Sequence, residues 1–351
     1  MLSSRASTVA ARAAFLGPGV LCPALLVVGC ADEWPAPAPV EAEEFAAAHV
    51  EWHTNRRDRL VSPPSGPLLW IGLWELPEGA TEFGSDESLP IVLPGEDSPA
   101  NGGVLHRDGE DVRLEPAMGA AFRLRTGDPI DRSVAGTPVV GPIQFAHDRS
   151  EVPAELTLGS LGMRTHMERG SDRLWLRAWD EDSPARETFQ LPEYFALDPD
   201  WRVTARYDPY DEPVVLPVTD VTDGTVEFEA PGELVFRVDG DEHRLIATAG
   251  ETSRDFFVLM WDETGLTQTY EGMRYLHVPF PEDEGWTLSQ PGWTTIDFNR
   301  TYNPPCVFTP YSVCALPPRE NYLTIAVTAG EKKPADHKPA RPMEASTASG
   351  P

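Results

Sequence analysis

Short apolar or alternating runs, separated by Gly, Pro, Asp and Asn, fill the chain from Gly66 onward. Period-two alternation in runs of this length is typical of β-strands. One series ends near 180 and a second begins near 201, with EDSPARETFQLPEYFALDPD (181–200) between them. Helices do not alternate with these runs, which argues against a parallel α/β fold. The pattern therefore predicts a mainly β protein with two antiparallel β-domains.

Two segments predict particular turns. HRDGEDVRL (106–114) carries an Asp-Gly pair between alternating runs, which favours a hairpin. TVEFEAPGELVFRVDGDEHRLIA (225–247) predicts three strands joined by tight turns.

One helix is predicted near the N-terminus, over residues 42–62. Phe45, Trp52 and Leu60 recur near one face, and acidic residues come first while arginines come last, as the helix dipole favours. His49 and His53 lie one turn apart, but the order H-V-E-W-H is not the H-E-x-x-H of metalloproteases. We expect both histidines to be solvated.

These patterns divide the 351 residues into six segments. They are a signal peptide (1–29), a Pro/Ala tether (30–41), the helix (42–62), a β-sandwich (63–182), a second antiparallel β-domain (183–331) and a disordered tail (332–351).

The first 30 residues indicate a location outside the cytoplasm. Arg5 and Arg12 precede an apolar run (13–28) that is too short and too interrupted to span a bilayer. The run ends in VVGC (27–30), which resembles the lipobox of bacterial lipoproteins. This resemblance implies that Cys30 is lipidated and anchors the protein, and Ala31 after it favours the outer membrane; the alternative is an ordinary signal peptide with Cys30 unmodified.

The charge of the chain excludes one class of partner. The formal net charge is −28, and removal of residues 1–29, which hold two arginines and no acid, would make it −30. Such a surface repels phosphate backbones, so we expect no nucleic acid partner. No motif in the sequence predicts a cofactor.

Two family resemblances add to this interpretation. FGSDESLPIVLP (83–94) is similar to the turn and strand that open forkhead-associated β-sandwiches, so the first β-domain is expected to be forkhead-associated-like. In that family a Gly-Arg pair and a later Ser and His hold phosphothreonine. Here Ser85 follows Gly84 and no Ser-x-x-His follows, so the phosphate site is not expected.

The C-terminal stretch carries the second resemblance. DFNRTYNPPCVFTPYSVCALPPRENYLTIAVTAGE (297–331) resembles the signature of the domain-of-unknown-function family 1684. Further motifs occur upstream in the expected order: Trp52 with Arg56 and Arg57, the GSD–IVLP segment, RGSDRLWLRAWD (169–180) and TYEGMRYL (269–276). The resemblance covers residues 50–331 and implies membership without a mechanism.

Cys306 and Cys314 allow three interpretations. Outside the cytoplasm a disulfide is the first, and it would stabilise by roughly 2.5 kcal/mol through closure of a short loop. A metal site with His277 as a further ligand is the second, although one wide cysteine pair is weak evidence for zinc. A cysteine nucleophile is the third, and no sequence feature supplies its base.

The polar residues around this stretch are the candidate ligand-binding side chains: Asp297, Asn299, Arg300, Tyr302, Asn303, Arg274 and Tyr270. The alternative is structural support of a Pro-rich loop, whose carbonyls need partners. Arg169, Arg173 and Arg177 recur every four residues, either as ion pairs on a sheet or as an anion-binding stripe.

The first function hypothesis is the binding of a small polar or anionic ligand. A hydrolase that uses Asp297 as a base or a cysteine-bound metal is an alternative, and an envelope scaffold is another. The sequence identifies no catalytic set, so whether the protein is an enzyme stays open.

Overall fold

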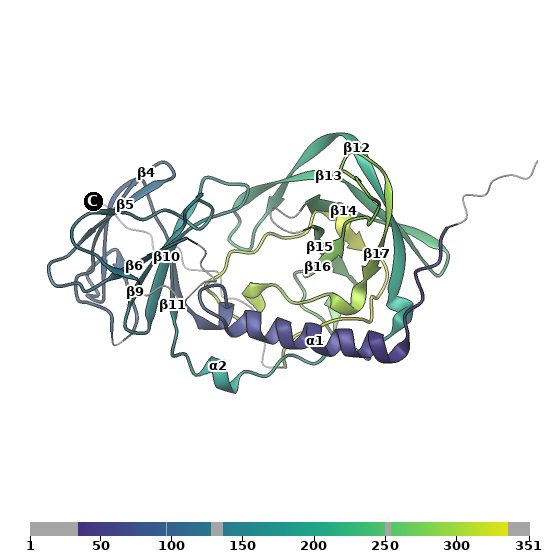
Figure 1. Cartoon of the computed structure of the whole chain (residues 1–351), viewed down its shortest axis with the longest axis horizontal. Coiled ribbons are helices and arrows are strands. Elements are labelled where there is room, and N and C mark those ends of the chain that lie inside the picture. Colours follow the sequence, from purple (N-terminus) through teal and green to yellow (C-terminus); the bar gives the residue numbers. More distant parts are fainter. Residues whose placement is uncertain (1–33, 96, 128–135, 250–253, 336–351) are drawn as a thin grey trace, which may run out of the picture. The chain divides into compact units, whose positions relative to one another are not determined.

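A computed structural model describes residues 34–95, 97–127, 136–249 and 254–335 (Figure 1). Its helices are α1 (Ala42–Val61) and α2 (Ala185–Thr188). Its strands are β1 (Trp70–Glu75), β2 (Gly79–Gly84), β3 (Ile91–Val92), β4 (Gly103–Asp108), β5 (Asp111–Pro116), β6 (Arg123–Thr126), β7 (Thr137–Pro138), β8 (Ile143–Gln144), β9 (Ala154–Leu158), β10 (Leu161–Met167), β11 (Leu174–Asp180), β12 (Arg202–Thr219), β13 (Thr225–Val238), β14 (Asp241–Ala249), β15 (Asp255–Asp262), β16 (Arg274–Pro279), β17 (Gly292–Asp297) and β18 (Tyr322–Leu323). The predicted mainly β fold with one N-terminal helix is confirmed.

Strands β1 to β11 form two sheets packed as a sandwich. One sheet has the order β1-β11-β10-β9-β6-β7 and the other β3-β2-β4-β5-β8. A single core holds inward side chains of both sheets, among them Phe83, Leu114, Met163 and Leu176. Alternation along β10 and β11 then places the intervening side chains on the outer face of the first sheet.

Strands β12 to β18 form a second, strongly curved sheet, a half-barrel with the order β16-β15-β14-β13-β12-β17, to which β18 adds in parallel beside β15 (Figure 1). Tyr207, Phe236, Phe256 and Phe298 fill its concave side, where Tyr207 and Phe256 stack with ring centroids 4.6 Å apart. Strand β17 leads directly into the Pro-rich stretch at Asp297.

The two predicted turn segments have different outcomes. The hairpin at 106–114 is present as β4 and β5. Residues 225–247 form two strands, not three, because β13 continues through Pro231 and Gly232, opposite an irregularity of β12 between Pro209 and Val214. A Cβ at residue 232 would lie 2.5 Å from the Asp208 carbonyl oxygen, so the glycine serves close packing and not a turn.

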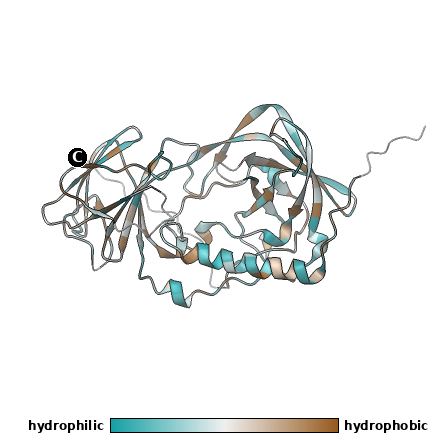
Figure 2. Cartoon of the chain, viewed as in Figure 1, coloured by the Kyte–Doolittle hydropathy of each residue, from teal (hydrophilic) through white to brown (hydrophobic). Residues whose placement is uncertain are grey.

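Helix α1 is polar over much of its length (Figure 2), and its buried face differs from the predicted one. His49 is buried, which corrects the expectation that it is solvated. Its Nδ1 lies 2.8 Å from the Phe45 carbonyl oxygen and its Nε2 lies 3.1 Å from Asp297 Oδ2. Arg56 is also buried, so the helix contributes polar side chains to the protein interior.

The residues from Ala36 onward form one compact unit. Cys30 and the proposed signal peptide lie outside the described residues, as does the tail from 336. Within the described part, no helix is both long enough and apolar enough to cross a membrane.

Candidate functional site

Asp297 lies at the start of the Pro-rich stretch and has three polar partners. Its carboxylate contacts His49, lies 3.4 Å from Arg300 Nε, and accepts a hydrogen bond from the Asn299 backbone N–H at 3.1 Å. Burial opposes the charged form, but the contacts with His49, Asn299 and Arg300 lower the pKa of Asp297 overall. The carboxylate is therefore held as a structural anion at the end of β17.

Asn299 and Asn303 both bind backbone. Asn299 donates to the Asp198 carbonyl at 2.8 Å and accepts from the Asp198 N–H at 3.1 Å. Asn303 is fully buried and donates to the Lys332 carbonyl at 2.9 Å. These are contacts of structural support, one of the two alternatives for this segment.

A buried ion pair ties α1 to the same stretch. Arg56 Nε donates to Glu331 Oε1 at 2.8 Å, and Glu331 is fully buried. Glu331 also accepts from the Tyr194 hydroxyl at 2.8 Å and from the Asn303 N–H at 2.7 Å. The Arg56 guanidinium lies 4.5 Å from the centre of the Tyr302 ring. The Glu331 carboxylate thus accepts hydrogen bonds from three residues of the protein, Arg56, Tyr194 and Asn303.

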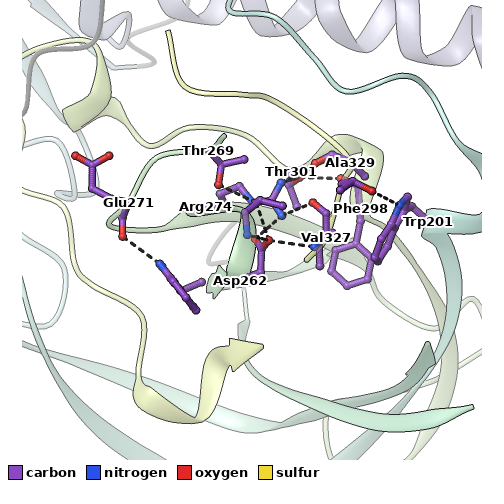
Figure 3. Close-up of polar contacts among 12 residues, drawn as sticks. Trp201, Asp262, Thr269, Glu271, Arg274, Phe298, Thr301, Val327 and Ala329 are labelled. Carbon is purple, nitrogen blue, oxygen red and sulfur yellow. Dashed lines mark hydrogen bonds and ion pairs between the residues drawn. The ribbon is translucent and has the colours of Figure 1, made fainter. Parts of the chain in front are cut away.

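Arg274 is buried in the half-barrel and forms an ion pair with Asp262 (Figure 3). Its guanidinium also donates to the carbonyls of Val327 at 3.0 Å and Ala329 at 2.6 Å, and to Thr301 Oγ1 at 3.1 Å. Burial lowers the pKa of Arg274, while Asp262 acts in the opposite direction. The Arg274 guanidinium therefore holds the backbone around residues 327–329 in place and is not accessible to a ligand.

Tyr302 belongs to a chain of three polar side chains. Its hydroxyl lies 2.9 Å from His277 Nε2, and His277 Nδ1 lies 3.3 Å from Asp255 Oδ1. Burial raises the pKa of Tyr302 to about 12, although Arg56 lowers it. A phenol with so high a pKa stays protonated and acts as a hydrogen-bond donor.

Cys306 and Cys314 lie together in the Pro-rich stretch, with the Cys306 N–H donating to Cys314 Sγ at 3.3 Å. Both are buried free thiols in this structure, so the predicted disulfide is not present and stays a prediction. Tyr270 lies beside them, its hydroxyl 4.0 Å from Cys306 Sγ. Among the described residues, no group of three or more His, Cys, Asp or Glu is placed to hold a metal ion.

Two cavities border this Pro-rich stretch on either side of the cysteines. The larger measures about 1320 Å³ and is lined by Phe189, Cys306, Phe308 and Lys332, among others. The smaller measures about 290 Å³ and is lined by side chains of the 148–149 loop, β10, β13, β15, β16 and the 313–315 segment. None of the seven predicted ligand-binding residues is among the described residues that line either cavity.

The smaller cavity contains a carboxylate–imidazole pair. His166 Nδ1 lies 2.6 Å from Asp148 Oδ2, and Met167 N–H donates to Asp148 Oδ1 at 3.1 Å. Burial opposes the charge of Asp148, but His166 and Arg164 lower its pKa to about 2. Burial and the positive charge of Arg177 lower the pKa of His166 to about 4, so the imidazole is neutral at pH 7.

A surplus of guanidinium groups lies on the outer sheet face beside this pair. Arg164 and Arg177 are cross-strand partners, as are His166 and Trp175. Arg164, Arg177 and Trp175 are 8%, 4% and 4% exposed. Within the described part of the chain, Arg164 Nε, Arg177 Nε and Trp175 Nε1 have no hydrogen-bond partner.

Arg177 is the least compensated of these groups. Its guanidinium lies 3.9 Å from the centre of the Trp70 ring, and no ion pair to it is found among the described residues. Burial and the charge of Arg164 lower the pKa of Arg177 to about 9, so it still carries its charge at neutral pH. A buried, unpaired charge is costly, and an anion nearby would offset that cost.

The three regularly spaced arginines of 169–177 thus have different environments. Arg173 binds Glu168 at 2.6 Å and also pairs with Asp220. Arg169 lines the smaller cavity and donates to the Ala249 carbonyl at 3.1 Å. Arg177 lies opposite Arg164 on the sheet and does not line the cavity. The spacing gave a partial signal for this site, whereas nothing in the sequence paired Asp148 with His166.

Comparison with known proteins identifies the family. Residues 187–332 match the model of a family described as "Protein of unknown function (DUF1684)". The chain belongs to DUF1684. The match confirms the predicted family over the C-terminal part of the 50–331 range, and the description of DUF1684 names no activity.

Among the solved structures that match this DUF1684 chain is one of an uncharacterized protein. It is the solution NMR structure of the uncharacterized protein from gene locus rrnAC0354 of Haloarcula marismortui, with 34% identity and a TM-score of 0.36. The alignment covers 44% of this chain and 83% of that chain. No protein of curated function matches.

Proposed function

We propose that this DUF1684 protein is a lipid-anchored, extracytoplasmic protein that binds a small amphipathic anion in the smaller cavity. The observation that supports this most is the buried guanidinium of Arg177, which acts on the cavity residue His166 and has no ion pair among the described residues, in a chain whose net charge is −28. Cys30 would carry the anchor, and Ala31 after it favours the outer membrane.

The walls of the smaller cavity support an amphipathic ligand. Val226, Phe228 and Leu259 are buried apolar side chains that line it. Arg169 and His166 line it on the polar side. A ligand with an anionic head and a short apolar body would match both walls, and a volume of about 290 Å³ restricts that body to roughly one ring or a short chain.

The two carboxylates of the cavity do not cancel its positive field. Asp148 is bound to His166, and Arg164 NH2 lies 3.6 Å from it. Glu168 is bound by Arg173 at 2.6 Å and 2.9 Å. Arg164 therefore offsets the charge of Asp148 and Arg173 that of Glu168, whereas no ion pair to Arg177 is found among the described residues.

A hydrolase is the second candidate, because the Asp148–His166 pair has the arrangement of an oriented general base. A base with a pKa of about 4 is weak at neutral pH, however, which favours binding over catalysis. Asp297, the base considered from the sequence, contacts His49 and Arg300 instead of lining a cavity. An envelope scaffold would need an exposed apolar patch in place of a concave site.

We also propose a Cys306–Cys314 disulfide in the oxidising compartment to which the lipoprotein signal would direct the chain. The proximity of the two cysteines supports it. This bond would join Cys306, which lines the larger cavity, to Cys314, whose chain neighbours line the smaller one.

Isothermal titration calorimetry with phenyl phosphate, inorganic phosphate and benzyl alcohol tests the binding proposal on the full chain. We expect phenyl phosphate to bind more tightly than inorganic phosphate, and benzyl alcohol not to bind. Equal affinity for the charged and uncharged aromatic probes, or no binding of either anion at millimolar concentration, would contradict the proposal.

A further inference from the structure

Cys306 and Cys314 are placed differently with respect to the two cavities. Cys306 lines the larger one. Cys314 is fully enclosed, but its chain neighbours Val313 and Ala315 line the smaller one. A reagent in the larger cavity would therefore meet the Cys306 sulfur first.

The surroundings of Cys314 favour a thiolate. Its sulfur accepts from the Cys306 N–H at 3.3 Å and lies 3.5 Å from Ser312 Oγ. Burial alone would raise the pKa of Cys314, but hydrogen bonds from Cys306, Ser312 and Tyr275 lower it. The hydrogen bond to Cys314 and burial raise the pKa of Cys306. Arg177 and a Cys314 thiolate also attract one another.

We propose that Cys306 and Cys314 form an exchangeable pair that reacts with small carboxylate-bearing thiols and disulfides in the larger cavity, with Cys306 as the attacked sulfur and Cys314 as the leaving and resolving sulfur. The inference rests on the proposed disulfide and treats it as a reactive bond instead of a purely structural one. Lys332 and Lys333 line the same cavity, where they pair with the exposed Glu193 at 3.7 Å and Glu271 at 3.9 Å, so the carboxylates of such a thiol would bind them in competition with these two glutamates.

Reduction has two balanced steps. A thiolate RS⁻ attacks Cys306 Sγ, the Cys306–Cys314 bond breaks, and its electron pair leaves on Cys314 as a thiolate. The product is a Cys306–SR mixed disulfide, which a second RS⁻ cleaves to RSSR and the Cys306 thiolate. Oxidation by RSSR runs the same steps in reverse and releases two thiolates.

The differences between Cys306 and Cys314 determine which of the two sulfurs is attacked. Exchange is faster when the leaving thiol has the lower pKa, and it requires access to the attacked sulfur. Cys306 borders the larger cavity, although it is only 3% exposed, and Cys314 has the hydrogen-bond donors that stabilise a leaving thiolate. Attack at Cys314 would be disfavoured on both grounds.

The test uses the full chain with glutathione and glutathione disulfide as probes, followed by acid quenching and peptide mapping, which separates Cys306 and Cys314 from Cys22 and Cys30. We expect glutathione on Cys306 in the wild type and in Cys314→Ser, and none on Cys314 in Cys306→Ser. Ser312→Ala should slow reduction of the wild-type pair, because it removes a hydrogen bond to the leaving Cys314 thiolate and a leaving thiol of higher pKa departs more slowly. Near-ultraviolet circular dichroism establishes that each variant is folded.

Each contrary result has its own meaning. If glutathione disulfide never oxidises the folded wild type, the proposed disulfide itself is wrong. If the disulfide forms but glutathione does not reduce it, or labels Cys314, the disulfide stands and the exchange proposal is overturned. The wild-type mapping decides even if a cysteine variant fails to fold.

Discussion

Arg164 and Arg177 lie directly opposite each other on adjacent strands, β10 and β11, and both are more than nine-tenths buried. Like charges in cross-strand positions are destabilising. One carboxylate, Asp148, lies near Arg164, and Trp70 covers Arg177. This strained surplus of positive charge distinguishes the outer sheet face from the acidic remainder of the chain.

Replacing Arg177 by Met should remove anion binding without loss of stability. The variant loses a cation–π contact of about 0.5–2 kcal/mol, but it also loses the desolvation cost of an unpaired charge. We therefore expect a free energy of unfolding within about 1 kcal/mol of the wild type, or higher. Chemical denaturation and calorimetry with phenyl phosphate measure the two effects.

Arg244→Met is the matched control for that variant. Arg244 is an exposed arginine that pairs with Glu233 and Glu242 on β13 and β14. The Arg244→Met variant should bind phenyl phosphate as the wild type does. A large loss of stability in Arg177→Met, or retained binding, would show that Arg177 is an ordinary structural residue.

Protonation of His166 should reduce the stability of the free protein at acidic pH. Its folded-state pKa of about 4 lies below the usual 6.5, so between these values the unfolded state binds the proton more strongly. The free energy of unfolding should fall by about 3 kcal/mol as the pH decreases from 6.5 to 4. His166→Gln should flatten this part of the profile, and an unchanged slope would contradict the assignment.

Anion binding should strengthen as the pH falls from 7 toward 5. A bound anion stabilises the imidazolium, so it raises the pKa of His166 and binding takes up a proton. The charged groups that act on His166 are Asp148, Arg164 and Arg177. Three further charged residues, Arg149, Glu168 and Arg169, line the same cavity. Titrations in buffers of different ionisation enthalpy measure the proton uptake; proton release would refute the assignment of His166.

Asp262→Asn tests the buried ion pair of the half-barrel. Removing the charge leaves Arg274 uncompensated at 1% exposure, so we expect a loss of about 3–5 kcal/mol in unfolding free energy. Asp208→Asn is the control, because Asp208 pairs with Arg206 and both are about a third exposed. That change should cost about 0–1 kcal/mol. Similar losses in both variants would mean that burial does not govern the strength of these pairs.

Local patterns predicted much of the fold. Alternation identified most strands, the Asp-Gly pair identified the β4–β5 hairpin, and one amphipathic run identified α1. The third strand expected at 225–247 was wrong, because Pro231 and Gly232 resemble a turn locally while the long partner strand β12 keeps β13 extended. Pairing with another long strand therefore determined the extended conformation at Pro231 and Gly232.

The candidate site was less predictable for the same reason. Asn299 and Asn303 have the chemistry of ligand residues, but their backbone partners, Asp198 and Lys332, come from other parts of the chain. Of the regularly spaced arginines, Arg169 lines the smaller cavity and Arg177 does not. The contact of His166 with Asp148 depends on the folded position of a loop 18 residues away, which no spacing rule describes.

The most direct test of the central claim is an experimental structure of the full chain with phenyl phosphate. The proposal predicts the phosphate beside His166 and Arg169 in the smaller cavity, with the ring against Val226 and Phe228. An empty smaller cavity under conditions where calorimetry shows binding, with the probe at another site, would contradict it.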